Sequence, residues 1–212
     1  MLLSGLDPLT IFVSIISLLI ALSVHELAHA YIADKLGDPT ARLQGRITLN
    51  PIKHIDYSGL LFMLLTPIGW AKPVMVDSFN FKNPRKDTAL VSLAGPASNI
   101  LFALVLSILC RLLNLFDQSQ INILGYFFIY LIRTNVVIAL FNLIPIHPLD
   151  GFGVVGGLLP SDQAHEWFQL QRYGMIFLLL LIIPLFGSGS MLDYILQPIM
   201  RFVIPLFVPA IM

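Results

Sequence analysis

A long apolar stretch near the amino terminus constrains this chain more than any other feature of its sequence. Residues 10–33 are mostly apolar, and about 24 residues at a helical rise of about 1.5 Å each can cross a hydrocarbon core of about 30 Å. No Lys or Arg precedes the stretch and no A-x-A-like cleavage site closes it. We therefore predict a transmembrane helix here rather than a signal peptide.

The composition supports a membrane protein. Of the 212 residues, 57% are hydrophobic and 11% are charged, which excludes an ordinary soluble domain and a disordered chain. The 12 Lys and Arg residues balance the 12 Asp and Glu residues, so the charge indicates no nucleic-acid partner. The single cysteine, Cys110, excludes an internal disulfide, so any metal would be held by His and carboxylates.

Further apolar segments predict an all-α polytopic membrane protein with about five transmembrane helices. Four segments follow the first one, at residues 88–115, 121–146, 173–186 and 191–212. Pro198, Pro205 and Pro209 interrupt the last of these, which makes it the weakest of the predicted spans.

A shorter apolar segment at residues 59–70 is predicted to be re-entrant, because about 12 residues with an internal proline are too few for an untilted crossing. A full crossing would place the two basic segments that flank it on opposite faces, whereas a re-entrant element keeps both cytoplasmic. The adjoining residues 71–80 are candidates for short β-strands. The flanking segments contain eight of the 12 basic residues, namely Lys35, Arg42, Arg46, Lys53, Lys72, Lys82, Arg85 and Lys86.

The first apolar helix contains the pattern H-E-x-x-H, at His25, Glu26 and His29. Two histidines four residues apart on a helix face the same way and can bind one Zn²⁺. Glu26 would then lie beside a zinc-bound water, whose pKa zinc lowers toward about 7, and could accept its proton. A chance match is expected in about one of a thousand chains of this composition.

Catalytic zinc requires a third protein ligand and an open position for water. The candidate is Asp150, near the end of the run NLIPIHPLDG that starts at Asn142 and follows the third long apolar segment. Pro145, Pro148 and Gly151 would break a regular helix there, and irregular backbone at membrane depth is tolerated only in a protein interior or beside a wet cavity.

The depths of the two motifs are compatible with one shared site. His25 lies about 22 Å from Thr10 and about 12 Å from Ala33 along the helix, which places it near the exit side. Asp150 also lies near the exit side of its segment. These two exit sides lie on the same face of the membrane only if the chain crosses the membrane an even number of times between them. The segments at 88–115 and 121–146 supply two crossings, and a re-entrant segment at 59–70 adds none. We expect an external amino terminus and a site that opens toward the cytoplasmic half.

The pairing of H-E-x-x-H with N-x-x-P-x-x-x-L-D-G in a later helix resembles the site-2 protease family of intramembrane zinc metalloproteases. The sequence GPASN at residues 95–99 is similar to a further element of that family. The resemblance covers about residues 10–160, the catalytic core of a single expected domain at 1–212, with C-terminal transmembrane segments at about 170–212. Without a PDZ-like insertion or a regulatory domain, the chain is similar to the short, core-only members.

The resemblance implies roles for individual residues. It implies His25, His29 and Asp150 as ligands of one Zn²⁺ per chain, Glu26 as general base, and Asn142 near the substrate backbone or the developing oxyanion. The implied reaction is hydrolysis of a peptide bond in or near the transmembrane helix of a single-pass substrate, at the cell membrane. Strands at 71–80 would pair with the unwound substrate by β-addition.

Some alternatives stay open from the sequence. A rival is a non-catalytic membrane protein that binds transmembrane helices or metal, although an inactive relative often loses a residue that is present here. His147 is a neighbour of the site, an alternative ligand or a packed polar residue, and His54 lies at the interface or near the site entrance. Gly95, Pro96 and Asn99 are expected to serve close helix packing rather than catalysis, with Asn99 as an interhelical hydrogen-bonding group. Arg133 snorkels to the interface or pairs with a buried carboxylate.

Overall fold

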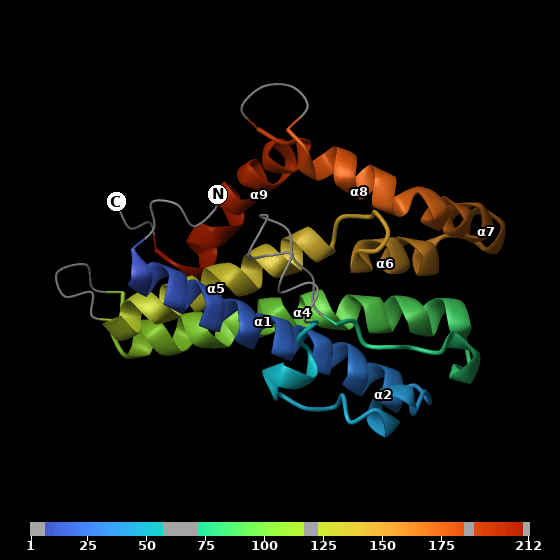
Figure 1. Cartoon of the computed structure of the whole chain (residues 1–212), viewed down its shortest axis with the longest axis horizontal. Coiled ribbons are helices and arrows are strands. Elements are labelled where there is room, and N and C mark those ends of the chain that lie inside the picture. The colour runs from blue at the N-terminus through green and yellow to red at the C-terminus, as the bar shows by residue number, and fades with distance from the viewer. Residues whose placement is uncertain (1–6, 57–71, 117–122, 185–188, 210–212) are drawn as a thin grey trace.

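The computed structural model describes residues 7–56, 72–116, 123–184 and 189–209, and the regular elements in these ranges are helices (Figure 1). Their α-helices are α1 Pro8–Lys35, α2 Thr40–Leu43, α4 Pro84–Leu112, α5 Ile123–Asn142, α6 Asp150–Leu158, α7 Ser161–Gln169, α8 Gly174–Ile182 and α9 Met191–Phe207. Short 3-10 helices are η1 Pro51–Lys53, η2 Ser78–Asn80 and η4 Leu170–Tyr173.

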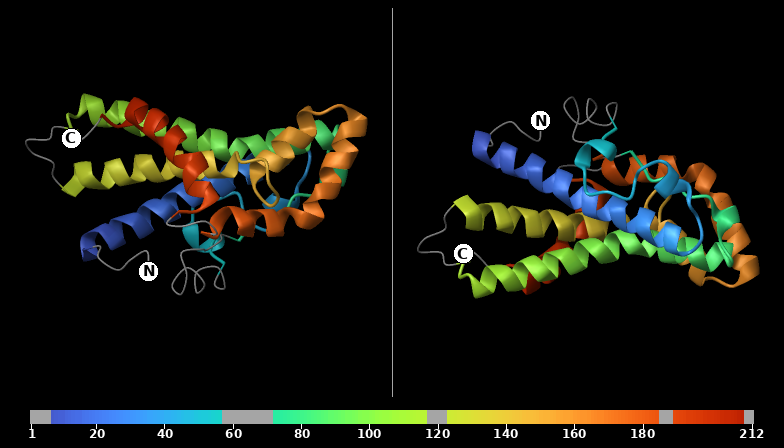
Figure 2. Two further views of the ribbon diagram at one scale, coloured as in Figure 1. Left: turned by 90° about the horizontal axis from the view of Figure 1, so that it is seen from above. Right: turned by 90° about the horizontal axis from the view of Figure 1, so that it is seen from below.

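Three helices, α1, α4 and α5, are long and apolar enough to cross a membrane. They lie side by side, with α4 running opposite to the other two (Figures 1 and 2). Thr10 and Tyr126, near the starts of α1 and α5, are in hydrogen-bond contact at 2.5 Å between hydroxyl oxygens. The chain is therefore a multi-pass membrane protein in which α1 and α5 run in the same direction, as expected from the depths of the two motifs.

The prediction of about five spans is confirmed for these three helices only. The segment predicted at 173–186 forms α8, which has 9 residues, and the segment at 191–212 forms α9, which has 17 residues with Pro198 and Pro205 inside it. Neither is long enough and apolar enough to count as a span within the described ranges. The predicted re-entrant segment at 59–70 lies outside the described residues.

The expected strands at 71–80 are absent from residues 72–80, so this prediction is wrong for the described part of the segment. Residues 72–77 are irregular and η2 follows them. Several of their backbone groups bond to side chains. The Val74 amide donates to Glu26 at 3.0 Å, and the Asp77 amide donates to Asp38 at 2.8 Å.

Arg46 occupies further backbone groups of the same segment. Its buried guanidinium donates to the carbonyl oxygens of residues 72 and 73, at 3.2 and 2.9 Å, and to that of Lys53. The Lys72 amide donates to the His54 carbonyl at 2.9 Å, and Pro73 has no amide hydrogen. Since each of these groups is already bonded or lacks a donor, none of them is available for a strand ladder.

Asp38, just after the end of α1, is connected to η2 by hydrogen bonds. Its side chain is fully buried and accepts hydrogen bonds from the Thr40 amide and hydroxyl, at 3.1 and 2.5 Å, and from the Asn80 side chain at 2.9 Å. Burial alone would raise the pKa of Asp38, but these hydrogen bonds and the one from Asp77 outweigh it and lower the pKa below the ordinary value. Asp38 is therefore ionised at neutral pH.

Replacing Asp38 by Ala should lower the thermal stability of the detergent-solubilised protein, because several buried donors lose their acceptor at about 1–3 kcal/mol each. Thermal unfolding measured from about pH 5 to 8 should show a constant difference from wild type, since a lowered pKa keeps the contribution intact above the ordinary value of 3.8. Asp162→Ala, at an exposed position of α7, is the control and should change little. Equal unfolding temperatures for the two variants would contradict the role of Asp38.

Candidate metal centre

His25, His29 and Asp150 lie together in the structure. The two histidines occupy successive turns of α1 and are 4% and 8% exposed. Asp150 is the first residue of α6, and its Oδ2 lies 3.0 Å from His25 Nε2 and 3.3 Å from His29 Nε2. One donor atom from each residue lies within 4.8 Å of the others. The structure thus brings together the three residues that the sequence predicts as ligands.

Glycines allow Asp150 to reach the histidines. A Cβ at Gly151 would lie 2.2 Å from the Leu143 carbonyl oxygen, so the turn after α5 closes only around a residue without a side chain. A Cβ at Gly153 would lie 2.3 Å from the Ser92 hydroxyl, and one at Gly157 would lie 2.1 Å from a side-chain carbon of α4. The small residues let α6 pack closely against α4, which fixes the position of Asp150.

Hydrogen bonds fix the orientation and tautomer of both imidazoles. His25 Nδ1 lies 2.6 Å from Asn99 Oδ1, and the Asn99 amide nitrogen donates to the Ala21 carbonyl and to Asn135. The oxygen of Asn99 therefore accepts, so His25 Nδ1 carries the proton. His29 Nδ1 lies 2.7 Å from the Val91 carbonyl, which can only accept. Both Nε2 atoms consequently present lone pairs toward Asp150.

The donor set fits a metal ion. Asp150 Oδ2 is buried and has no hydrogen-bond partner, although two Nε2 atoms lie close to it. Two imidazole lone pairs and a carboxylate oxygen that face one another repel unless a cation or added protons lie among them. Two His and one Asp match the nitrogen and oxygen ligands of catalytic zinc, whose fourth position stays open for water. The residues present therefore fit one Zn²⁺.

Glu26 lies on α1 between the two histidines in sequence and outside the three-residue cluster. It is 8% exposed, and its Oε2 accepts the hydrogen bond from the Val74 amide. Asn142 is half-buried at the end of α5, and its side-chain nitrogen donates to the Ile138 carbonyl in the same helix at 3.0 Å. No described contact joins Asn142 to the cluster, so the structure does not bring its side chain to the three ligand candidates.

Asn99, Asn135 and Gly95 surround the ligand candidates. The expectation that Asn99 is an interhelical hydrogen-bonding group is confirmed, because it holds His25 of α1 and bonds to Asn135 of α5, a residue that the sequence did not single out. A Cβ at Gly95 would lie 2.3 Å from His29 Nε2, so this glycine leaves space for the ring. The signal available in the sequence was an asparagine within each of two apolar segments, Asn99 and Asn135, because a polar side chain at membrane depth needs a partner.

His147 and His54 lie outside the cluster. The His147 ring packs edge-on against Phe152, with 5.7 Å between ring centroids, and burial lowers its pKa so that it is neutral at pH 7. His54 is buried, and its Nε2 lies 2.9 Å from the Thr48 carbonyl. Among the described residues the candidate metal group comprises His25, His29 and Asp150, so neither of the other histidines serves as an alternative ligand there.

Relatives of known name match most of the chain. It is 40% identical over 191 residues to "Putative zinc metalloprotease YwhC" of Bacillus subtilis, covering 88% of this chain and 85% of the relative. It is 29% identical over 181 residues to "Putative zinc metalloprotease Rip2" of Mycobacterium tuberculosis (strain H37Rv), covering 82% and 68%. With zinc metalloprotease MJ0392 of Methanocaldococcus jannaschii the identity is 29% over 185 residues, covering 86% and 45%. No family model and no solved structure matches the chain.

The fold and the site define a multi-pass membrane protein with a buried His-His-Asp centre. Its relatives are named as zinc metalloproteases, and one of them is similar over nearly the whole of both chains. The chain belongs to the site-2 protease family of zinc metalloproteases.

Asn99→Leu should weaken zinc binding by about 10–100-fold, because the His25 ring loses the acceptor that fixes its tautomer. Asn99→Asp keeps an oxygen facing His25 and should retain more affinity than the leucine variant. Competition with a metal chelator on the purified protein measures both. The same affinity in wild type and Asn99→Leu would show that this hydrogen bond does not support the site.

Gly95→Ala should disrupt the centre sterically, since the new methyl group would lie 2.3 Å from His29 Nε2 and 2.7 Å from a carbon of the His25 ring. We expect substoichiometric zinc and a loss of about 1–3 kcal/mol of stability from overpacking. Gly189→Ala is the matched control, because its Cβ would make only ordinary contacts at 3.7 Å or more. Zinc content by mass spectrometry compares the two, and full occupancy in Gly95→Ala would refute the steric argument.

Proposed function

We propose that this protein is a zinc-dependent intramembrane endopeptidase that hydrolyses a peptide bond in or near the transmembrane helix of a single-pass membrane protein. One observation carries the proposal. His25, His29 and Asp150 converge on one point inside a bundle of apolar helices, and Glu26 is adjacent to His25 on α1. Zinc metalloprotease relatives support the same conclusion.

His25, His29 and Asp150 would hold the zinc ion through His25 Nε2, His29 Nε2 and Asp150 Oδ2. When bound there, zinc supplies a Lewis acid that polarises a carbonyl and activates water. Asn99 and the Val91 carbonyl hold the opposite ring nitrogens, so the two imidazoles are already oriented for this task.

Glu26 is the proposed general base. The Val74 amide donates one hydrogen bond to its Oε2, which leaves the carboxylate with further lone pairs to accept a proton from water and return it to the leaving amine. Burial in the bundle keeps this exchange away from bulk solvent. The base is therefore oriented by a backbone hydrogen bond that does not depend on the metal.

Asn142 is proposed to contact the substrate backbone or the developing oxyanion. Its position at the end of α5, just before the turn that leads to Asp150, supports this role. Its amide nitrogen donates one hydrogen bond to the Ile138 carbonyl, which leaves a second N–H and the amide oxygen to contact a substrate.

We further propose that the site faces the cytoplasmic half of the cell membrane. The end of α1 and the start of α4 lie at the same end of the helix bundle (Figure 1), and His29 of the site bonds there to the Val91 carbonyl of α4. Lys35 at the end of α1 and Arg85 and Lys86 at the start of α4 place positive charge there, as the positive-inside rule expects of cytoplasmic segments. The partners would be the bilayer and a single-pass substrate, with no nucleic acid.

Glu26→Gln should retain zinc and lose hydrolysis by about 10²–10⁴-fold or more, because the amide cannot accept the proton of water. The membrane proteomes of cells carrying wild type or Glu26→Gln should differ in single-pass proteins that accumulate uncut in the variant. Glu166→Gln changes the other glutamate of the chain, which is exposed on α7, and is the matched control. An equally active, zinc-loaded Glu26→Gln protein would refute the assignment of Glu26 as general base. Wild-type protein that binds zinc but cleaves no membrane protein would instead favour a non-catalytic metal-binding protein.

A further inference from the structure

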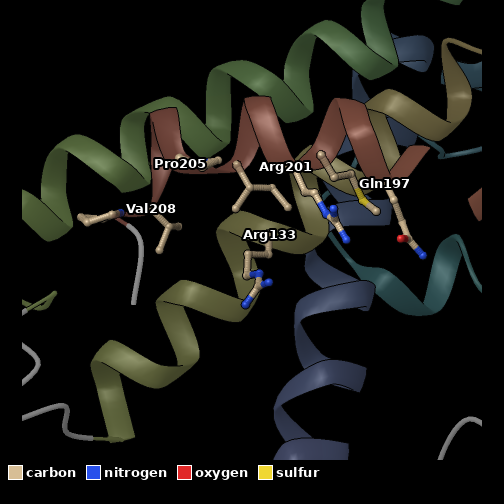
Figure 3. A pocket seen from close by; sticks show the side chains of 8 residues that line it. Arg133, Gln197, Arg201, Pro205 and Val208 are labelled. Carbon is tan, nitrogen blue, oxygen red and sulfur yellow. The ribbon is translucent and has the colours of Figure 1, made fainter. Parts of the chain in front are cut away.

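A cavity of about 450 Å³ lies between α5 and α9, away from the candidate metal centre (Figure 3). Its polar side chains are Arg133 from α5 and Gln197 and Arg201 from α9. The remaining wall is apolar and is formed by Met200, Ile204, Pro205, Val208 and Pro209. The cavity therefore combines two cationic groups with an apolar surface.

Neither arginine has a hydrogen-bond or ion-pair partner within the described ranges, and the same ranges supply no carboxylate to the cavity. Other arginines of the chain are satisfied differently. Arg46 donates to three backbone carbonyls, and Arg111 donates to the carbonyls of Leu206 and Phe207. Arg133 and Arg201 therefore keep their donors available for a bound group.

The position of Arg133 makes an unpaired charge costly. It lies 10 residues, or about 15 Å, from the start of α5, which places it near the middle of a candidate span. Ionisable residues at such depth are expensive and normally pair with a partner or a ligand. A second guanidinium beside the same cavity adds repulsion that is strong in a low-dielectric environment.

The helix α9 cannot easily move to separate the two charges. The Ser107 hydroxyl on α4 donates to the Phe207 carbonyl at 2.5 Å, and Phe207 and Val208 are buried in the core with Ile132 and Val136 of α5. The end of α9 is thus anchored close to both neighbouring helices. The cavity is a fixed feature of the fold rather than a loose gap.

Large apolar side chains on α9 remain exposed beside the cavity, including Phe202 at 75% and Leu206 at 64%. In a bilayer such side chains contact lipid. A lipid molecule could therefore approach the cavity laterally while its headgroup stays toward the interface, and the long arginine side chains can extend toward that headgroup. A volume of about 450 Å³ lies in the range of sites for small ligands, and it is too small for a partner helix about 10 Å across.

We propose that this cavity binds a phosphate-bearing anion, with the headgroup of an anionic phospholipid as its source in the membrane. A planar guanidinium pairs with phosphate oxygens through two parallel hydrogen bonds, and two guanidiniums offset the negative charge while the apolar wall receives the glycerol and acyl region. Gln197 adds a neutral donor. The site is separate from the metal centre, so it does not depend on the proposed peptidase activity.

The full chain, purified and placed in nanodiscs, tests this proposal. Phosphatidylglycerol should raise the unfolding temperature of wild type above its value in phosphatidylcholine, whose cationic choline is repelled by the arginines. Arg133→Gln and Arg201→Gln should each weaken the apparent lipid affinity about tenfold, and the double variant should lose the lipid-dependent shift. Arg172→Gln, an exposed arginine outside the cavity, should behave as wild type.

Further arms identify the ligand. Inorganic phosphate added in phosphatidylcholine nanodiscs should give little shift if lipid is the source, and a full shift if the free ion is the source. Arg133→Lys with Arg201→Lys keeps the charge but loses the paired hydrogen bonds, and should show a reduced shift even if the glutamine double variant fails to fold. Equal unfolding temperatures of wild type in the two lipids would overturn the proposal. So would a double variant whose unfolding temperature rises in phosphatidylglycerol as much as that of wild type. So would an absent shift in wild type together with slower substrate cleavage in the double variants, which would assign the cavity to an acidic protein side chain.

Discussion

The mutual repulsion of three acceptors is the constraint on which this structure depends. Two imidazole lone pairs and a carboxylate oxygen converge because each ring is held from behind, by Asn99 and by a backbone carbonyl of α4. Such an arrangement is stable only when a cation or added protons lie among the three acceptors, and the surrounding helices hold them in place. Glycines of α6 bring the carboxylate in, and Gly95 leaves space for the rings.

The sequence predicted the parts of the site that follow from local periodicity. His25 and His29 share a helix face because they are four residues apart, and Asp150 stood out because prolines and a glycine interrupt an apolar segment beside it. Those rules depend on spacing alone. The membrane depth of the two motifs then gave the common direction of α1 and α5, which the structure confirms.

The remaining features depend on contacts between distant segments. Residues 72–80 looked suited to strands, but Arg46, Asp38 and Glu26 occupy their backbone groups, and no local pattern announces such long-range side-chain bonds. Hydropathy indicated five apolar segments, but it does not show how long a helix each one forms, and α9 ends after 17 residues. The partner of Asn99 could not be predicted, because His25 lies 74 positions earlier in the chain.

The distance along the chain between the two halves of the metal centre has a consequence for biogenesis. His25 and Asp150 are separated by about 125 residues, and α4 and α5 lie between them in the chain. A chain that has emerged from the ribosome only as far as α5 has the glutamate and both histidines but no third ligand. The full ligand set therefore cannot assemble until Asp150 has followed α5 out of the ribosome.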